Sequence, residues 1–350
     1  MRILIVVGLA WHAPDVARAF EALGDTTLTL TAQPAAFTTP VRRVPCRTLL
    51  RLSGRFPLLA PIVHRLFSWI AAEFVRTSDF DAVLIWSSFG ASFVRHPGPP
   101  VMVIRGSNHI RTQFEMLKPA PGKQRRPSLG IIRLEEFEYE RATLITVPTQ
   151  EIESDLKWPS GKMVQSPYGF GEPGIPANQI AKAPDGALRA VFVGEISYRK
   201  GADRLLFIDS TSLVRAIDIV GGGKPAGLQL PSKAVVHGQI AREKVDEIMG
   251  EAHVLILLSR EEGMARVGME ALAHGLPILV TPESGLAQWC VGGAGIVLQG
   301  DSTMNQQEDA IREIAANWEG MANQARLIST SWSWIDHAKR LRSALQDVEN

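Results

Sequence analysis

The sequence predicts an α/β protein built from two doubly wound parallel-sheet domains that face a cleft. Two series of short apolar segments alternate with helical stretches, one ending near residue 150 and the other starting near residue 188. This alternation is typical of parallel strands joined by helices that cover both faces of a sheet. A length of 350 residues leaves room for two hydrophobic cores. Residues 172–186, rich in Pro, Gly, Ala and Lys, separate the two series and are typical of a connection between domains.

The first domain is predicted to span residues 1–171. Its strand candidates are short apolar runs at residues 3–7, 27–31, 82–86, 101–104 and 144–147. Amphipathic stretches predict helices around residues 14–23, 62–77 and 129–141. The first apolar run is too short for a signal peptide, and no run in the sequence is long enough to cross a bilayer. We therefore expect a cytoplasmic protein.

The second domain is predicted to span residues 188–330, after a linker at 172–187. Its strand candidates are the apolar runs at residues 190–193, 216–220, 234–237, 254–258, 277–280 and 295–298. The final segment, 331–350, has the pattern of an amphipathic helix after two tryptophans. Because ligands in such sheets bind beyond the carboxyl ends of the strands, functional residues are expected in the loops that follow them.

Charge is distributed unevenly along the chain. Residues 1–131 carry an excess of Lys and Arg, and the remainder carries an excess of Asp and Glu. The segment from Arg42 to Arg76 holds seven arginines among Leu, Phe, Ile and Trp69. It could form a surface that rests on anionic lipid at the inner face of the membrane, close to a lipid-linked acceptor. Equally, it could be a core helix whose polar face carries arginine.

The segment that carries most information is Glu262-Gly263-Met264-Ala265-Arg266-Val267-Gly268-Met269-Glu270. It follows an apolar strand, and the helix it predicts ends at Gly275-Leu276-Pro277 before the next strand. The backbone N–H groups and dipole of such a helix start favour an anion. Glu262 and Glu270 stand about two helical turns apart and can address one ligand. A phosphate held by amides, with sugar hydroxyls held by carboxylates, describes a nucleotide-sugar site; the alternative is an ordinary helix with a solvated Glu at each end.

This segment resembles the donor-site signature of family 4 glycosyltransferases (glycosyltransferases group 1), E-G-(F/M)-(G/P)-x4-E-A-x-A-x-G-x-P, and departs from it only at Ala265. The resemblance implies the GT-B architecture of two Rossmann-like domains. It also implies a retaining enzyme that moves a sugar from a nucleoside-diphosphate sugar to a saccharide or lipid-linked acceptor, in cell-surface glycan synthesis. By the same resemblance Glu262 contacts the sugar and Glu270 the ribose, and the donor also contacts the helix start, Gly263, Met264, Ala265, Arg266 and Val267.

A second element, at residues 191–201, resembles the family's V-G-R-(I/L)-x3-K-G pattern. In the family a Lys, and usually an Arg, neutralise the donor pyrophosphate, and Lys200 matches this Lys. A cation there would stabilise the negative charge that grows on the departing diphosphate. Glu195 stands where the family usually has the Arg, which reverses the charge, and Arg199 is the neighbour that could replace it. The alternative for Lys200 is a solvated loop lysine.

Two further loops of the second domain could lie near the nucleotide. Three glycines at residues 221–223 follow a strand, but they lack the spacing of a phosphate-binding Walker loop, so we exclude an ATPase or kinase. They fit either close approach of a nucleotide or a simple turn. The segment His237-Gly238-Gln239-Ile240 resembles the family's F-x-G-x-(V/I) element near the nucleotide base, which makes Gln239 and Ile240 donor-binding candidates and leaves His237 as either a packed strand residue or a contact.

In the first domain, the resemblance points to loops that follow strands. His109 lies just after the apolar run 101–104, where the family often has a His near the transferred sugar and the acceptor. His109 is the candidate for a polar contact to the sugar, and the alternative is that it has only a structural role. Arg105, close to it in the sequence, is a weaker candidate for binding the acceptor. Gly8, after the first strand, matches a loop that lets the donor phosphates approach the backbone. His12 could face the acceptor.

No metal cofactor is expected. Asp79-Phe80-Asp81 has the form of a metal-binding DxD triplet, but it precedes a strand and so belongs to the edge of the sheet away from the expected site. The cysteines, Cys46 and Cys290, lie far apart, which argues against a disulfide framework or a cysteine metal site. No nucleic-acid partner is expected.

The final helix is expected, by the same resemblance, to cross back to the first domain. The rival interpretation of the whole chain is a non-catalytic nucleotide-sugar-binding or scaffold relative of the family, which Glu195 and the altered first loop motivate. A dehydrogenase is disfavoured because no G-x-G-x-x-G follows the first strand of either domain.

Overall fold

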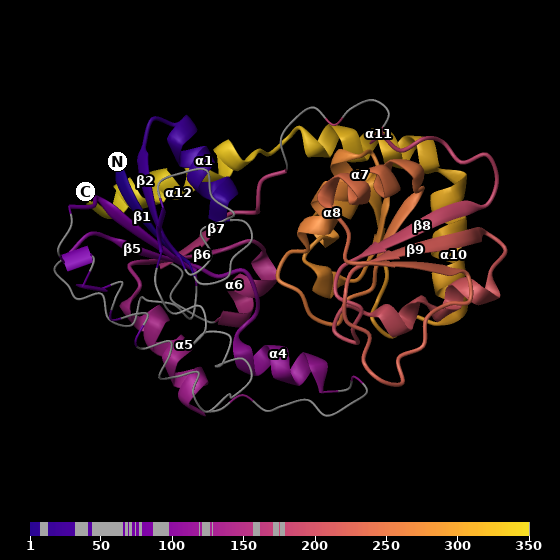
Figure 1. Cartoon of the computed structure of the whole chain (residues 1–350), viewed down its shortest axis with the longest axis horizontal. Coiled ribbons are helices and arrows are strands. Elements are labelled where there is room, and N and C mark those ends of the chain that lie inside the picture. The colour runs from indigo at the N-terminus through magenta and orange to yellow at the C-terminus, as the bar shows by residue number, and fades with distance from the viewer. Residues whose placement is uncertain are drawn as a thin grey trace. The chain divides into compact units, whose positions relative to one another are not determined.

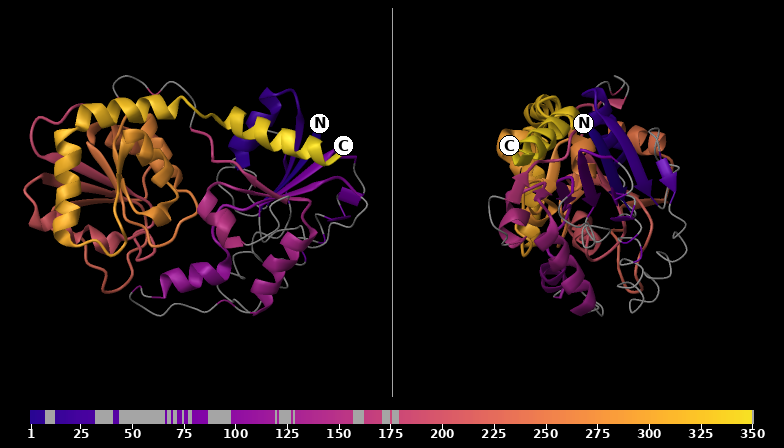
Figure 2. Two further views of the ribbon diagram at one scale, coloured as in Figure 1. Left: turned by 180° about the vertical axis from the view of Figure 1, so that it is seen from behind. Right: turned by 90° about the vertical axis from the view of Figure 1, so that its left-hand side faces the viewer.

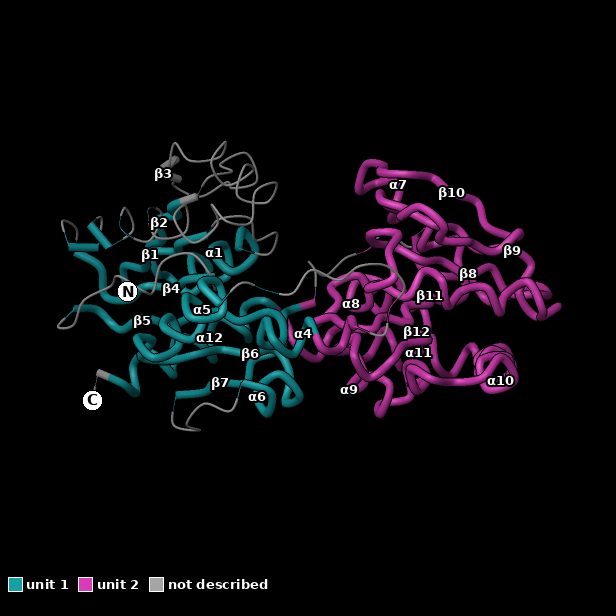
Figure 3. The backbone as a smooth tube through the Cα atoms, turned by 90° about the horizontal axis from the view of Figure 1, so that it is seen from below, with its two compact units in different colours: residues 1–114, 125–169, 334–350 teal, residues 115–124, 170–333 magenta. Residues whose placement is uncertain are grey.

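The computed structural model describes residues 1–7, 13–31, 41–43, 66, 69, 72–73, 75–76, 79–86, 98–118, 120, 127, 129–156, 162–170, 175 and 179–349. The chain divides into two compact units, coloured separately in Figure 3. The first unit comprises residues 1–114, 125–169 and 334–350, and the second comprises residues 115–124 and 170–333. Each unit is built on its own parallel sheet, while the limits of 1–171 and 188–330 inferred from the sequence stay a prediction.

The sheet of the first unit has seven parallel strands in the order β3-β2-β1-β4-β5-β6-β7. The strands are β1 (Arg2–Val7), β2 (Thr26–Thr31), β3 (Val41–Arg43), β4 (Ala82–Trp86), β5 (Val101–Ile104), β6 (Leu144–Val147) and β7 (Met163–Gln165). All the strands predicted in the first domain are confirmed within a residue. Strands β3 and β7, three residues each at the two edges of the sheet, were not predicted.

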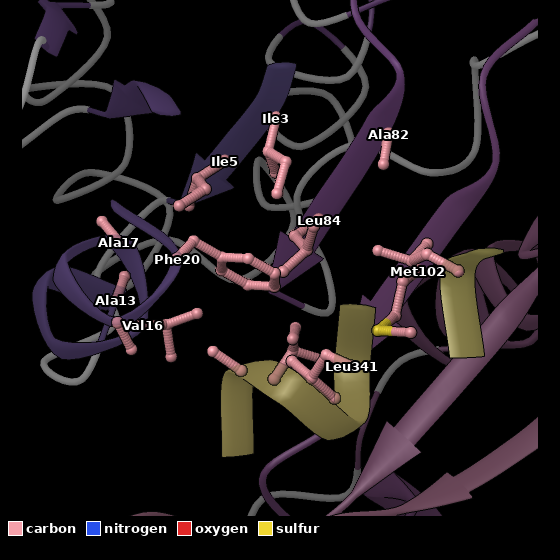
Figure 4. Packing of buried hydrophobic residues seen from close by; sticks show 14 of the residues in the cluster. Ile3, Ile5, Ala13, Val16, Ala17, Phe20, Ala82, Leu84, Met102 and Leu341 are labelled. Carbon is pink, nitrogen blue, oxygen red and sulfur yellow. The ribbon is translucent and has the colours of Figure 1, made fainter. Parts of the chain in front are cut away.

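Both faces of this sheet are covered, because alternate side chains of a strand point to opposite faces. On one face Ile3 and Ile5 pack against α1 (Ala13–Ala22) and α12 (Trp334–Glu349) around Phe20 and Leu341, as Figure 4 shows. On the other face Leu4 and Val6 pack with side chains of α5 (Leu129–Arg141) and α6 (Gln150–Leu156). Burial on both faces explains why β1 reads as a continuous apolar run. The remaining helix of this region is α4 (Ile110–Leu117).

Helix α12, drawn in yellow in Figure 2, therefore belongs to the first unit although it ends the chain. Asp25 ties it to the start of β1, because its carboxylate lies 2.8 Å from the amino group of Met1 and 3.3 Å from Nη2 of Arg342. At the other end of the helix, the rings of Trp334 and Tyr168 stack at 5.9 Å. His337 lies beside them, and its Nδ1 is 2.8 Å from the carbonyl of Pro167 and 2.7 Å from Oγ of Ser166.

His337 makes the stability of the first unit depend on pH. Its Nδ1 donates to a carbonyl, and its buried Nε2 has no hydrogen-bond partner in the described part of the chain, so a second proton would have no acceptor. Burial lowers the pKa of His337 to about 4. The unfolded chain binds this proton near pH 6.5 and the folded chain near pH 4, so stability is full above about pH 6.5 and falls as the pH drops toward 4.

We expect this histidine to contribute a loss of about 2 kcal/mol of unfolding free energy between pH 7.5 and about pH 5. The variant His337→Asn, whose amide can still donate to Pro167, should be less stable at pH 7.5 but show a correspondingly weaker dependence on pH. Urea unfolding of both proteins at the two pH values measures the difference. An identical pH dependence in the two proteins would show that His337 does not titrate in this way.

The sheet of the second unit has six parallel strands in the order β10-β9-β8-β11-β12-β13. Strands β8 and β9 of this sheet are labelled in Figure 1. The strands are β8 (Leu188–Val193), β9 (Val214–Val220), β10 (Ala234–Gly238), β11 (Val254–Leu257), β12 (Ile278–Val280) and β13 (Gly295–Val297), which confirms all those predicted. The helical segments are η6 (Ala202–Ser210), α7 (Arg242–Glu251), α8 (Arg266–Ala273), η7 (Pro282–Ser284), α9 (Ala287–Trp289), η8 (Cys290–Ala294), α10 (Met304–Ala316) and α11 (Trp318–Ser329). Among the described residues no helix is long and apolar enough to span a bilayer.

The strand order of this second sheet reverses between β8 and β11. From β8 the chain runs outward to β9 and β10, and then returns to β11 on the other side of β8. The two strands are hydrogen-bonded neighbours, so the loops that leave their carboxyl ends start side by side. Such a reversal is the point where open parallel sheets place their ligands. The second unit therefore has one preferred place for a site, at the ends of β8 and β11.

Candidate functional site

The loops after β8 and β11 hold the charged residues singled out in the sequence. Lys200 lies in the first loop and Glu262 in the second, and they form an ion pair whose side chains are 12% and 17% exposed. Nη1 of Arg199 lies 3.3 Å from the same carboxylate oxygen of Glu262. Two cations thus converge on one carboxylate at the point where the strand order reverses.

Arg199 is oriented toward this pair, which the sequence alone could not establish. Its guanidinium also approaches the buried Glu261, at 3.7 Å from Oε2, and donates to the carbonyl of that residue at 3.2 Å. Its distance from Glu195 is longer, 3.9 Å, and Glu195 is exposed. The negative charge of Glu195 therefore stays at the rim of the cluster, while the positive charge of Arg199 lies beside Lys200.

Glycines allow these loops to come close together. Gly201 has φ +71°, and a Cβ atom at this position would lie 1.9 Å from the carbonyl oxygen of Leu258. Gly221 has φ +142°, and a Cβ atom there would lie 1.8 Å from the carbonyl oxygen of Gly194. The glycines after β9 thus have a packing reason of their own, which supports the turn interpretation of residues 221–223.

Helix α8 starts beside the cluster. Met264 and Ala265 are buried, and Ala265 is the residue before the first helical turn, where no side-chain hydrogen bond caps the helix in this described segment. The N–H of Ala265 donates to the carbonyl of Ser284, and Gly285, at φ +70°, lets that segment approach Gly263. Helix α8 begins with Arg266 and Val267. The backbone N–H groups at a helix N-terminus such as this one can bind an anion.

Glu270 lies on α8, after Glu262 in the sequence, and pairs with a different cation. Nη1 of Arg242, on α7, is 2.7 Å from Oε1 of Glu270, and Nη2 of Arg266 is 3.7 Å from the same atom. Partial burial lowers the pKa of Arg242, but the charges and hydrogen bonds of Glu270 and Asp246 outweigh burial and raise it. The sequence did not indicate Arg242 as a partner, because α7 is distant in sequence and carries no motif.

The end of β10 and the residues just after it include one residue with a buried partner, His237, as well as Gln239 and Ile240, which are at least partly exposed. Nε2 of His237 lies 2.7 Å from Oδ1 of the fully buried Asp218, which Arg189 also contacts at 2.5 Å. Burial raises the pKa of Asp218, but hydrogen bonds from Arg189 and His237 outweigh it and lower the pKa. The structure thus gives His237 a packed partner. Gln239 is exposed, with its amide next to Gly222, and Ile240 is half-buried.

In the first unit, Arg105 and His109 lie in the loop after β5 and approach the buried carboxylate of Glu135. Nη2 of Arg105 lies 2.6 Å from Oε1 of Glu135, and both side chains are at most 6% exposed. His109 places its Nε2 at 3.6 Å from Oε2 of Glu135, while its backbone N–H donates to Asp155 at 2.7 Å. Tyr139 donates to Glu135 at 2.9 Å. Arg105 is committed to this network, so its contact with an acceptor stays a prediction.

Several sequence predictions fall outside the described residues. They are Gly8, His12 and most of the segment from Arg42 to Arg76. Asp79 and Asp81 are described and lie before β4, where they accept from the side chain and backbone N–H of Arg2 at 3.1 and 2.6 Å. Within the described ranges, no group of three or more His, Cys, Asp or Glu side chains is arranged to hold a metal ion.

Comparison with known protein families gives a match within the second unit. Residues 187–317 match the family model "Glycosyl transferases group 1". No curated protein sequence matches the chain significantly. The solved structures that the chain resembles include sucrose-phosphate synthase from Thermosynechococcus elongatus, at a TM-score of 0.76 and 15% identity over 100% of this chain and 99% of that one.

Two further solved structures have the same architecture. WaaG, a glycosyltransferase involved in lipopolysaccharide biosynthesis, has a TM-score of 0.66 at 17% identity, over 98% of each chain. HepE of Anabaena, solved in complex with UDP-glucose, has a TM-score of 0.67 at 14% identity, over 99% of this chain and 100% of that one. The GT-B fold of two Rossmann-like domains is thereby confirmed. Residues 187–317 thus match the group 1 glycosyltransferase model, and the chain as a whole shares the fold of these solved structures.

Proposed function

We propose that this chain transfers a sugar from a nucleoside-diphosphate sugar to a saccharide or lipid-linked acceptor, with retention of the anomeric configuration. The observation that carries the proposal is the convergence of Lys200 and Arg199 on Glu262 beside the start of α8. Two cations and a helix start are suited to a diphosphate, and the acids at the two ends of the motif are suited to hydroxyl groups.

In this proposal the second unit binds the donor. Lys200, Arg199 and the backbone amides of residues 263, 264, 266 and 267 hold the diphosphate, with Glu262 on the sugar and Glu270 on the ribose. The N–H of Ala265 donates to Ser284, so Ala265 borders the donor without donating to it. Gln239 and Ile240 border the base. No enzyme nucleophile takes part, and the preorganised positive charge around the departing diphosphate supplies much of the rate enhancement. No metal ion is required.

The first unit is proposed to bind the acceptor, with His109 as a polar contact to the reacting sugar and Arg105 and His12 nearby. Gly8 would allow the donor phosphates to approach the backbone of this domain. The arginines between Arg42 and Arg76 would hold the enzyme on anionic lipid at the inner face of the membrane, which suits a lipid-linked acceptor in cell-surface glycan synthesis. WaaG, one of the structural neighbours, acts in lipopolysaccharide biosynthesis.

The proposal predicts that one of the free diphosphates UDP, GDP and ADP stabilises the protein. A ligand at about 100 times its Kd stabilises the folded state by about 2.7 kcal/mol, which a thermal shift detects. The sugar nucleotides of the same base should then release diphosphate in the presence of a suitable acceptor. Binding without turnover across donor and acceptor panels would favour a non-catalytic relative, and absence of binding by all three diphosphates would contradict the proposed site.

A further inference from the structure

Two arginines that the proposed chemistry does not use connect the loops of Lys200 and Glu262. Arg204 lies on η6, which follows Lys200, and its Nη1 donates to the carbonyl of Leu258 at 2.9 Å. Arg260 lies in the other loop, two residues before Glu262, and its Nη1 donates to the carbonyl of Tyr198 at 2.7 Å. The side chain of Arg204 thus donates to the backbone of the Glu262 loop, and that of Arg260 donates to the backbone of the Lys200 loop. We refer to Arg204 and Arg260 as the crossed arginines.

The contact of Arg260 has a defined geometry. Its two terminal nitrogens lie 2.7 and 2.8 Å from the two carboxylate oxygens of Asp203, so the pair is bidentate. The backbone N–H of Arg260 also donates to the carbonyl of Arg199 at 2.8 Å. The side chains of Arg260 and Asp203 are 15% and 20% exposed. A lysine at position 260 would keep the charge but could not form the two parallel bonds, because its ammonium is a single point of contact.

The crossed arginines are placed together against their mutual repulsion. Burial lowers the pKa of Arg204, and the positive charge of Arg260 lowers it further, while Asp203 acts in the opposite direction. The same two loops are in direct contact at Gly201 and Leu258, so a small displacement of one loop is passed to the other.

The residues that the crossed arginines contact lie on both sides of the proposed diphosphate-binding residues in the sequence. Lys200 lies between Tyr198 and Asp203, which are both partners of Arg260, and Glu262 follows Arg260 by two residues. We propose that the crossed arginines are positioning residues that hold Lys200 and Arg199 at a fixed distance from Glu262, so that a diphosphate and its sugar are gripped together. This inference rests on the proposed function, and it concerns residues that touch neither the diphosphate nor the sugar.

A double-mutant cycle tests the inference. Arg260→Lys should weaken binding of the diphosphate that the protein accepts, UDP, GDP or ADP, by about ten-fold, and should lower kcat by about ten- to a hundred-fold because the reacting groups are misplaced. In a Lys200→Ala background the same change should weaken diphosphate binding by clearly less than about ten-fold, because only Arg199 remains of the two cations that it positions. Arg204→Met, which removes the donor to the carbonyl of Leu258, should behave in the same way, and it replaces Arg260→Lys if melting shows that variant to be unfolded.

The matched control is Arg312→Lys on α10. Arg312 also contacts two acids, Asp309 and Glu308, but it is exposed and distant in sequence from both loops. This variant should bind and turn over like the wild type. Equal losses of affinity in the wild-type and Lys200→Ala backgrounds, or a loss of melting temperature with unchanged kcat and Kd, would overturn the positioning role alone. A wild-type protein that binds none of the three diphosphates would instead overturn the proposed function.

Discussion

The variant Lys200→Ala is expected to turn over about 10²- to 10³-fold more slowly than the wild type, the effect of removing one preorganised group that stabilises charge in a transition state. The lysine is almost buried against Glu262, in a position to meet the charge that develops on a departing diphosphate. The melting temperature should change little, because Arg199 remains 3.3 Å from Glu262 and keeps that carboxylate paired. Steady-state kinetics, diphosphate titration and thermal melting measure the three quantities.

Two variants make the Lys200 experiment specific. Lys200→Arg retains the positive charge and should recover part of the diphosphate affinity. Lys244→Ala removes an exposed lysine of α7 that pairs with Glu247 at 2.6 Å, a comparable loss of charge away from the loops, and should leave turnover unchanged. Wild-type turnover by Lys200→Ala would place the diphosphate site elsewhere in the chain.

Many of the strands could be predicted because parallel strands buried on two faces read as short continuous apolar runs, as in β1, β4 and β11. The exceptions illustrate the limit of this signal. Strand β3 consists of Val41, Arg42 and Arg43, and its composition carries no apolar run. Helix α4 is eight residues long and has no fully buried residue, so it lacks the long apolar stripe of a core helix. Short edge strands and exposed helices are defined by tertiary contacts, which a pattern of local residues does not contain.

The site was predictable where a motif places residues within one loop and helix, and less so where the partners are distant in sequence. Glu262 and Lys200 were identified from two segments that resemble motifs of family 4 glycosyltransferases, and the roles given to them remain predictions. Neither the direction of Arg199 nor the pairing of Arg242 with Glu270 could be derived. The crossed contacts of Arg204 and Arg260 depend on β8 and β11 being neighbours, and that pairing follows from the reversal of the strand order.

The variant Glu262→Gln is expected to separate binding from catalysis. In the structure the carboxylate of Glu262 is the anion that Lys200 and Arg199 hold, and a diphosphate has to compete with it for both cations. Glutamine has the same shape without the charge. It should therefore leave the cations available and bind the free diphosphate more tightly, by about ten-fold for each 1.4 kcal/mol of repulsion removed.

Turnover by Glu262→Gln should nevertheless fall by about 10²-fold or more, because the proposed contact between this acid and the donor sugar is lost. Lys200→Ala is expected to bind the diphosphate more weakly, so the two variants should shift affinity in opposite directions while both lose turnover. Glu247→Gln, an exposed acid of α7, serves as the control and should change neither quantity. Weaker diphosphate binding by Glu262→Gln would mean that this carboxylate supports the bound diphosphate instead of competing with it, because in that case its charge would be needed to hold Lys200 and Arg199 in place.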